Sequence, residues 1–153
     1  MFDPEVFVGG ETLSNQFPIG LIGEATTQVL PELTARHLGS GTVAVFATPE
    51  MVRLMEHAAV NGLKPYLAEG QQSVGTVVNV KHLAATPIGA TVTARAELIA
   101  VDGRRLTFMV SAHDGSELIG EGIHERAVID LARFEAKVKV KAEVKPDLDE
   151  SEA

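Results

Sequence analysis

The chain has 153 residues, of which 45% are hydrophobic and 22% are charged, and its formal net charge at pH 7 is −8. This length predicts a single domain with one core, and the composition excludes a wholly disordered chain. The negative charge disfavours nucleic acid as a partner. No apolar run approaches the roughly 18 to 20 residues that a membrane helix requires, so no membrane partner is expected.

The chain contains no cysteine, which excludes disulfides and thiolate chemistry and fits a cytoplasmic location. Its first five residues carry acid where a secretory signal carries base, so export is not expected. Four acids crowd the last seven residues: Asp147, Asp149, Glu150 and Glu152. We therefore expect one domain over residues 1–140 and an acidic, flexible tail over residues 141–153.

The first predicted strand covers residues 23–30, although threonines and a glutamine dilute its pattern. A helix is predicted to begin with Thr48 as N-cap, because proline and then an acid follow it. Apolar or small residues then recur at helical spacing: Met51, Leu54, Met55, Ala58, Ala59 and Gly62. The helix is expected to end within residues 62–65, where glycine precedes proline.

After Gly70 the hydrophobic period changes to two, which predicts strands. These strands cover residues 74–82, 92–98, 106–112 and 117–129. The dipeptides Asp102-Gly103 and Asp114-Gly115 predict tight turns between them. In the last strand, one face carries Ile119, Ile123, Ala127 and Ile129.

The predicted order is one strand, one long helix and about four antiparallel strands, which indicates an α+β domain. One helix can cover only one face of such a sheet. The other face, or an edge, is then available to a second subunit. We expect a homodimer, with further pairing of dimers left open.

Glu56 lies on an apolar side of the predicted helix. At about 100° per residue, its neighbours on a helical wheel are Val52, Val60 and Leu63. A carboxylate in such surroundings either finds a partner or favours its protonated form, which makes Glu56 a candidate base or nucleophile. The alternative is a boundary glutamate whose stem packs while its carboxylate reaches water.

Thr48 and His82 are the next candidates. Capping alone explains a threonine at position 48, but free N–H groups at a helix N-terminus also stabilise an oxyanion. Eight residues, or about 12 Å along a helix axis, separate Thr48 from Glu56, so a substrate would have to span them. His82 ends a strand of valines and is either a structural residue or a catalyst.

Gly75 lies inside a predicted strand, where an isolated glycine indicates either a bulge or the close approach of another group. Gly120 and Gly122 allow the same two interpretations. The other histidines lack metal-ligand spacing: His37, His57, His113 and His124. The sequence has no nucleophile elbow, phosphate-binding glycine loop or dinucleotide fingerprint, so neither a metal nor a cofactor is expected.

Several segments resemble the fluoroacetyl-CoA thioesterase family. They are residues 45–48, 51–52, 54–56, 65–67, 75–76, 82, 84–87, 101–105, 111–115 and 124–129. The resemblance covers roughly residues 20–140 and implies the hotdog fold, a long central helix wrapped by an antiparallel sheet, paired as a dimer. This agrees with the element order predicted above.

The resemblance implies hydrolysis of an acyl-CoA thioester to free acid and coenzyme A. It places the family's catalytic residues on Thr48, Glu56 and His82, and its substrate-binding residues on Gly75 and Arg126. Glu56 would attack the carbonyl or act as base for water. The Gly75 N–H would bind the oxyanion, and His82 would relay protons. Arg126, with Arg104 and Arg105 as weaker candidates, would meet the phosphates of coenzyme A.

One segment departs from the family pattern. In the fluoroacetate-resistance enzyme, the segment before the helix is rich in phenylalanine and forms a lid over the acyl pocket. Here residues 38–42 read Leu-Gly-Ser-Gly-Thr, without an aromatic ring, so we expect an acyl group other than fluoroacetyl. Three alternatives remain: a hotdog hydratase or dehydratase acting on enoyl- or hydroxyacyl-thioesters, a non-catalytic acyl-CoA-binding protein, and a subunit with a role in assembly only.

Overall fold

The computed structural model describes residues 16–144. Five strands form one antiparallel sheet: β1 (Ile22–Gln28), β2 (Gln71–His82), β3 (Thr91–Asp102), β4 (Arg105–His113) and β5 (Leu118–Asp130). Their order across the sheet is β1-β3-β4-β5-β2, so β1 and β2 are the edges. The predicted element order and antiparallel pairing are confirmed.

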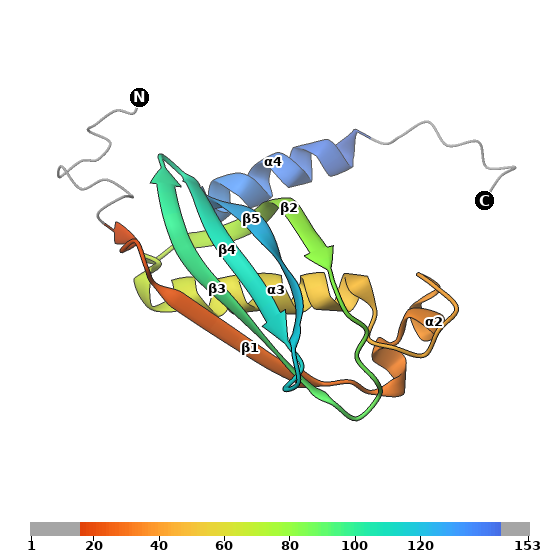
Figure 1. Ribbon diagram of the computed structural model, residues 1–153. Helices are drawn as coiled ribbons and strands as arrows, with labels where there is room; N and C mark the ends of the chain where they lie inside the picture. Colours follow the sequence, from red (N-terminus) through yellow and green to blue (C-terminus); the bar gives the residue numbers. More distant parts are fainter. Residues whose placement is uncertain (1–15, 145–153) are drawn as a thin grey trace, which may run out of the picture.

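One long helix, α3 (Thr48–Leu63), packs along one face of the curled sheet (Figure 1). The smaller helical elements are η2 (Pro31–Leu33), α2 (Ala35–Leu38), η3 (Lys64–Tyr66) and the C-terminal α4 (Leu131–Glu143). Helix α3 ends within the predicted interval. No helix among residues 16–144 is both long and apolar enough to cross a membrane.

The core lies between α3 and the inner face of the sheet. Buried residues alternate along β3 and β4 and meet the apolar side of α3: Val92, Ala94, Ala96, Leu98, Leu106, Phe108, Val110, Ala112, Met51, Met55, Ala58, Ala59 and Leu63. The turn glycines Gly103 and Gly115 have φ values of 61° and 92°, in the left-handed region that tight turns favour. Both predicted turns are therefore confirmed.

Helix α3 and strand β1 approach each other through two glycines. A Cβ atom at Gly23 would overlap the backbone oxygen of Ala58 and would lie 2.7 Å from the Cα of Gly62. Gly62 is buried inside the helix and does not terminate it. Helix and strand are thus in contact backbone to backbone on this side.

The predicted N-cap role of Thr48 is wrong. Ala47 is the N-cap, it makes no side-chain capping bond, and Thr48 is the first helical residue. The physical reason is that the Thr48 hydroxyl is hydrogen-bonded to His82, at the end of β2. A capping preference acts within a few residues, and here a contact between distant residues overrides it.

A bulge changes which side chains of β5 face the core. The β4–β5 register passes from Ala112↔Gly120 to His113↔Leu118, so Ile119 is an extra residue in β5. Ile119 is buried, but the later residues of the same parity, including Ile123, lie on the outer face and are half-buried or exposed. The residues that face the core are Gly120, Gly122, His124, Arg126 and Val128.

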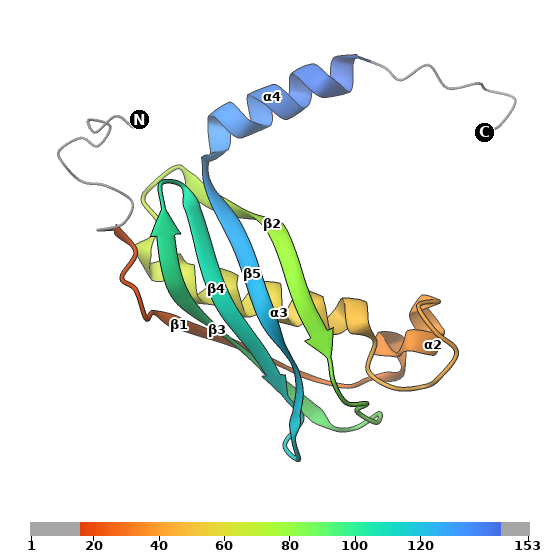
Figure 2. The ribbon, with the colours of Figure 1, turned by 45° about the horizontal axis from the view of Figure 1, so that its top comes forward.

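The short helix α2 and the terminal helix α4 were not predicted. Asp130 caps α4, accepting a hydrogen bond from the Arg133 backbone at 3.0 Å. Beyond Leu131 every residue of α4 is exposed, and Figure 2 shows the helix projecting away from the sheet. The predicted boundary after residue 140 falls inside α4, and the four acidic residues within the last seven lie outside the described residues.

Candidate active site

Thr48 and His82 meet where α3 begins and β2 ends. The Thr48 hydroxyl and the His82 Nδ1 are 2.7 Å apart and share a hydrogen bond. Burial lowers the pKa of His82 below its usual value, and a backbone hydrogen bond with Ala84 acts in the opposite direction. The other ring nitrogen, Nε2, is buried and has no partner within residues 16–144. Buried polar atoms without a partner are uncommon, and they mark places where a ligand or water binds.

Glu56 and Gly75 face each other across the gap between α3 and β2. A Cβ atom at Gly75 would overlap the Glu56 Oε2, so only glycine leaves room for the carboxylate. The β2–β5 register passes from Gly75↔Arg126 to Val77↔Glu125, which leaves Thr76 as a bulge. Both interpretations of the strand glycine, a bulge and a close approach, are therefore correct.

The two glycines of β5 also mark close approaches. The Met51 side chain occupies the space beside Gly120, and the backbone of Asn79 and Val80 occupies the space beside Gly122. Neither position lies at a register shift between β2 and β5. Close approach therefore applies to both residues, and the bulge interpretation applies to Gly120 as well, because Gly120 adjoins the extra residue Ile119 in the β4–β5 pairing.

Arg126 is the charged partner of Glu56. Its Nη1 lies 3.4 Å from the Glu56 Oε2, and its side chain is 7% exposed against 40% for Glu56. The Arg126 Nε donates to the Ser73 hydroxyl at 2.8 Å, and Nη2 donates to the Ser73 carbonyl at 3.1 Å. The guanidinium is thus held inside the domain, beside the Glu56 carboxylate that was predicted from the sequence to be a base or a nucleophile.

His124 completes this group and was not identified from the sequence. Its Nε2 lies 3.1 Å from the Arg126 Nη1 and 4.0 Å from the Glu56 Oε2. Its ring stacks on Phe108 with centroids 6.4 Å apart. The available signal was alternation within β5, where residues 124 and 126 share a face, but the bulge at Ile119 conceals that this face is the inner one.

The predicted residues therefore form two groups. Thr48 and His82 form the first group. Glu56, Gly75 and Arg126 form the second group, to which His124 and Ser73 also belong. No hydrogen bond joins the two groups within the described part of the chain. A substrate that contacts both groups of one chain has to extend along α3, over about 12 Å.

The two weaker arginine candidates lie elsewhere. Arg104 donates to the Val128 carbonyl at 3.3 Å, and the exposed Arg105 pairs with Asp102 at 3.2 Å. Neither contacts Glu56 or His82 in the described chain. Residues 16–144 also contain no cluster of three or more potential metal ligands.

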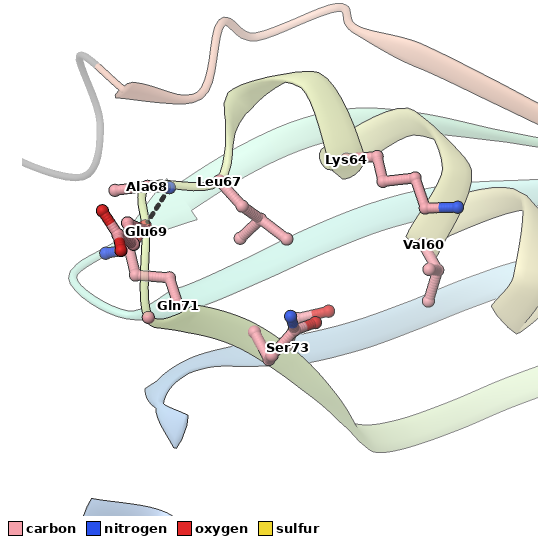
Figure 3. A pocket seen from close by; sticks show the side chains of 9 residues that line it. Val60, Lys64, Leu67, Ala68, Glu69, Gln71 and Ser73 are labelled. Atoms are coloured by element: carbon pink, nitrogen blue, oxygen red, sulfur yellow. Dashed lines mark hydrogen bonds between the residues drawn. The ribbon is translucent and has the colours of Figure 1, made fainter. Parts of the chain in front are cut away.

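A cavity of about 440 Å³ lies between the C-terminal end of α3 and the start of β2, and Figure 3 shows side chains that line it. Its walls are Val60, Lys64, Leu67, Ala68, Glu69, Gly70, Gln71, Gln72 and Ser73. Val60 lies one helical turn after Glu56, and Ser73 is the residue that holds Arg126. The cavity therefore gives the carboxylate's side of α3 a concave wall, whose charged lining residues are Lys64 and Glu69.

Comparison with known proteins places these observations in a family. Residues 29–132 match the family described as fluoroacetyl-CoA-specific thioesterase. The fluoroacetyl-CoA thioesterase of Streptantibioticus cattleyicolor is 51% identical over 129 residues, covering 78% of this chain and 93% of that protein.

Two solved structures are also similar. A mutant of the fluoroacetyl-CoA thioesterase FlK in complex with acetyl-CoA superposes with a TM-score of 0.75 at 48% identity, covering 81% of this chain and 98% of that one. A thioesterase superfamily member from Thermus thermophilus has a TM-score of 0.77 at 33% identity, covering 84% and 98%.

The antiparallel sheet wrapped along α3 and the similarity to these two structures define an α+β hotdog-fold acyl-CoA thioesterase. The chain belongs to the family of fluoroacetyl-CoA-specific thioesterases, and it is a thioester hydrolase. The fold and the enzyme class predicted from the resemblance are confirmed.

Proposed function

We propose that this chain hydrolyses an acyl-CoA whose acyl group differs from fluoroacetyl, with Glu56 as the reacting carboxylate. The observation that carries the proposal is the position of Glu56, which lies against the Gly75 backbone and beside the buried Arg126. A buried guanidinium and a strand backbone on either side fix the position of this carboxylate, as a nucleophile or a base requires.

The contacts suggest how the two carboxylate oxygens divide their roles. Arg126 and His124 are both nearest to Oε2, which leaves Oε1 to face the thioester. In the nucleophilic route, Oε1 bonds to the carbonyl carbon, the C–S bond breaks, and coenzyme A leaves as thiolate. Water then hydrolyses the mixed anhydride. In the alternative route, Oε1 takes a proton from the water that attacks the carbonyl.

The remaining predicted residues fit this reaction. The Gly75 N–H is the proposed oxyanion donor, because the bulge brings its backbone against the carboxylate. The unpartnered Nε2 of His82 is the atom proposed to orient water or protonate the leaving thiolate. Thr48 fixes the ring through Nδ1. For Arg126 we propose a role at the carboxylate and acyl end in place of the predicted contact with the phosphates of coenzyme A, because its buried donors already bind Ser73, His124 and Glu56.

The segment before α3 supports a different acyl group. Helix α2 ends at Leu38, which is followed by Gly39 in the left-handed conformation. Residues 39–42 carry small side chains, and Val43 is exposed. Without a phenylalanine, this segment offers no ring to close over a two-carbon acyl group, which favours acceptance of larger ones.

We also propose that the chain forms a homodimer through β2. This edge strand has 12 residues, and both Val77 and Val78 are exposed on it. An exposed edge of this length pairs readily with a second strand. Such pairing would also cover the half-exposed Glu56. Assembly beyond the dimer and the cytoplasmic location stay predictions.

The test is release of free thiol from acetyl-, propionyl-, butyryl- and fluoroacetyl-CoA by the full chain. Glu56→Gln is expected to lower kcat/KM by about 10²–10⁴-fold, the range for loss of a general base or nucleophile. Glu125→Gln is the matched control, because this glutamate neighbours Arg126 on the opposite face of β5. It should retain the wild-type rate.

Four outcomes would overturn the proposal. Full activity of Glu56→Gln would remove Glu56 from the chemistry. A preference for fluoroacetyl-CoA would contradict the proposed acyl group. Water addition to an enoyl-CoA without thiol release would indicate a hydratase, and tight acyl-CoA binding without turnover would indicate a binding protein.

A further inference from the structure

His124 has a defined tautomer in this fold. Its Nδ1 lies 2.8 Å from the Val77 carbonyl oxygen, which can only accept a hydrogen bond. The proton of the neutral ring is therefore on Nδ1, and Nε2 carries the lone pair. Nε2 accepts a hydrogen bond from the Arg126 Nη1 at 3.1 Å. The ring thus connects the β2 backbone to the guanidinium.

The surroundings keep this ring neutral. His124 is 1% exposed, and burial is the main cause that lowers its pKa below the usual value. The Arg126 charge lowers the pKa further, whereas the Val77 hydrogen bond and the Glu56 carboxylate raise it. A protonated ring would direct an N–H from Nε2 toward the N–H groups of Arg126, so the contact requires the neutral form.

Arg126 is fixed on two sides. Ser73 accepts from Nε and Nη2, and His124 accepts from Nη1. The same Nη1 reaches the Glu56 Oε2 at 3.4 Å. The position of the carboxylate therefore depends on a guanidinium whose own orientation depends on acceptors from β2 and β5.

We propose that His124 is a positioning residue, which orients Arg126 through Nε2 and thereby holds the Glu56 carboxylate in its reactive geometry. This inference rests on the proposed function of Glu56. His124 itself contacts neither the thioester nor the leaving group in this arrangement. Its contribution is orientation, and a small displacement of a reacting group costs about 100-fold in rate.

Two substitutions of His124 each keep one of the two hydrogen bonds of its ring and remove the other. In His124→Gln, the amide lies near the place of Nε2 and its oxygen can still accept from Arg126, while the bond to Val77 is lost. In His124→Asn, the amide lies near the place of Nδ1 and can still donate to Val77, while the acceptor for Arg126 is lost. Each variant thus loses one hydrogen bond, which makes the pair a matched comparison.

The expected result is a difference in kcat between these variants. His124→Asn should lower kcat by about tenfold to 100-fold with little change in KM, and His124→Gln should retain most of the wild-type kcat. Thermal unfolding of both variants serves as the control for folding. Equal kcat values in the two variants, or wild-type kcat in His124→Asn, would overturn the inference.

A second measurement does not depend on turnover. In ¹⁵N NMR, the Arg126 Nη1–H signal should stay sharp and protected from exchange in the wild type and in His124→Gln, and broaden in His124→Asn, because Nη1 is the atom that donates to His124. Persistence of a sharp signal in His124→Asn would show that His124 does not order the guanidinium. If the wild type releases no thiol, the proposed function fails, and the NMR signal alone decides the role of His124.

Discussion

The two sides of helix α3 are built in different ways. Toward β1, Gly23 and Gly62 bring the backbones of strand and helix into contact. Toward β2, Gly75 leaves a space that the Glu56 carboxylate fills, with Arg126 and His124 behind it. A glycine provides the room on both sides, but backbone occupies it on one and a charged side chain on the other. The first side fixes the helix, and the second carries the chemistry.

The largest expected effect is on the β1 side. Gly23→Ala would place a Cβ against the backbone of Ala58 and Gly62, which cannot move without shifting the helix. We expect a loss of about 3 kcal/mol or more in the free energy of unfolding. Urea unfolding measures this loss, with Glu24→Ala, an exposed neighbour in β1, as control. Unchanged stability of Gly23→Ala would show that the backbone contact does not fix the helix.

The next effect is on the β2 side and concerns activity more than stability. Gly75→Ala would place a Cβ against the Glu56 carboxylate and 3.3 Å from the Arg126 Nη1, both ends of flexible side chains. The fold should therefore survive, with a loss of about 1 kcal/mol. The displaced carboxylate should lower kcat/KM by about 100-fold. Thiol release and urea unfolding on the same preparation test this prediction, and a variant that unfolds while its folded fraction keeps full activity would contradict it.

The smallest effect is the response of the β2 side to pH. Burial lowers the pKa of both His82 and His124 below 6.5, so below pH 6.5 the unfolded chain binds more protons than the folded one. Stability is then complete above pH 6.5 and falls as the pH is lowered from that value. Between pH 7 and pH 5 we expect a loss on the order of 1 kcal/mol.

The control for this response is His124→Gln, which removes one of the two titrating rings. Urea unfolding at several pH values should give a shallower fall in stability for this variant than for the wild type. Identical pH profiles would show that His124 is not buried in its neutral form. The glycine contact on the β1 side contains no titrating group, so it should not contribute to the pH dependence of stability.

Much of the fold was predictable because its elements repeat with clear periods. The change from helical spacing to alternation after Gly70 gave the correct order of elements, and two Asp-Gly pairs gave the turns. The strand that contains Ile119 shows where such reasoning stops. One extra residue in β5 reverses the face on which every later side chain of that strand lies. The position of a bulge depends on how β5 pairs with β4, and the sequence of β5 alone does not contain that information.

The site was predictable in part. Its carboxylate was visible from the helical wheel, and Gly75 from its place in a strand, because both signals are local. His124 was not, because its importance comes from Val77 and Arg126 meeting it across two strands. Thr48 was misread for a related reason, since its hydroxyl binds a residue 34 positions away. Helix α4 differs from these cases, because its signal is local: Asp130 is the N-cap, and apolar residues follow at helical spacing.

The glycine contact between β1 and α3 has a consequence for engineering the substrate range. Because backbone atoms set the lateral position of the helix there, residues on the far side of α3 can be exchanged without moving it. Segment 38–42 and the cavity wall at Val60 and Leu67 lie outside that contact. A library confined to segment 38–42 would vary the proposed cover of the acyl group while helix α3 keeps its place.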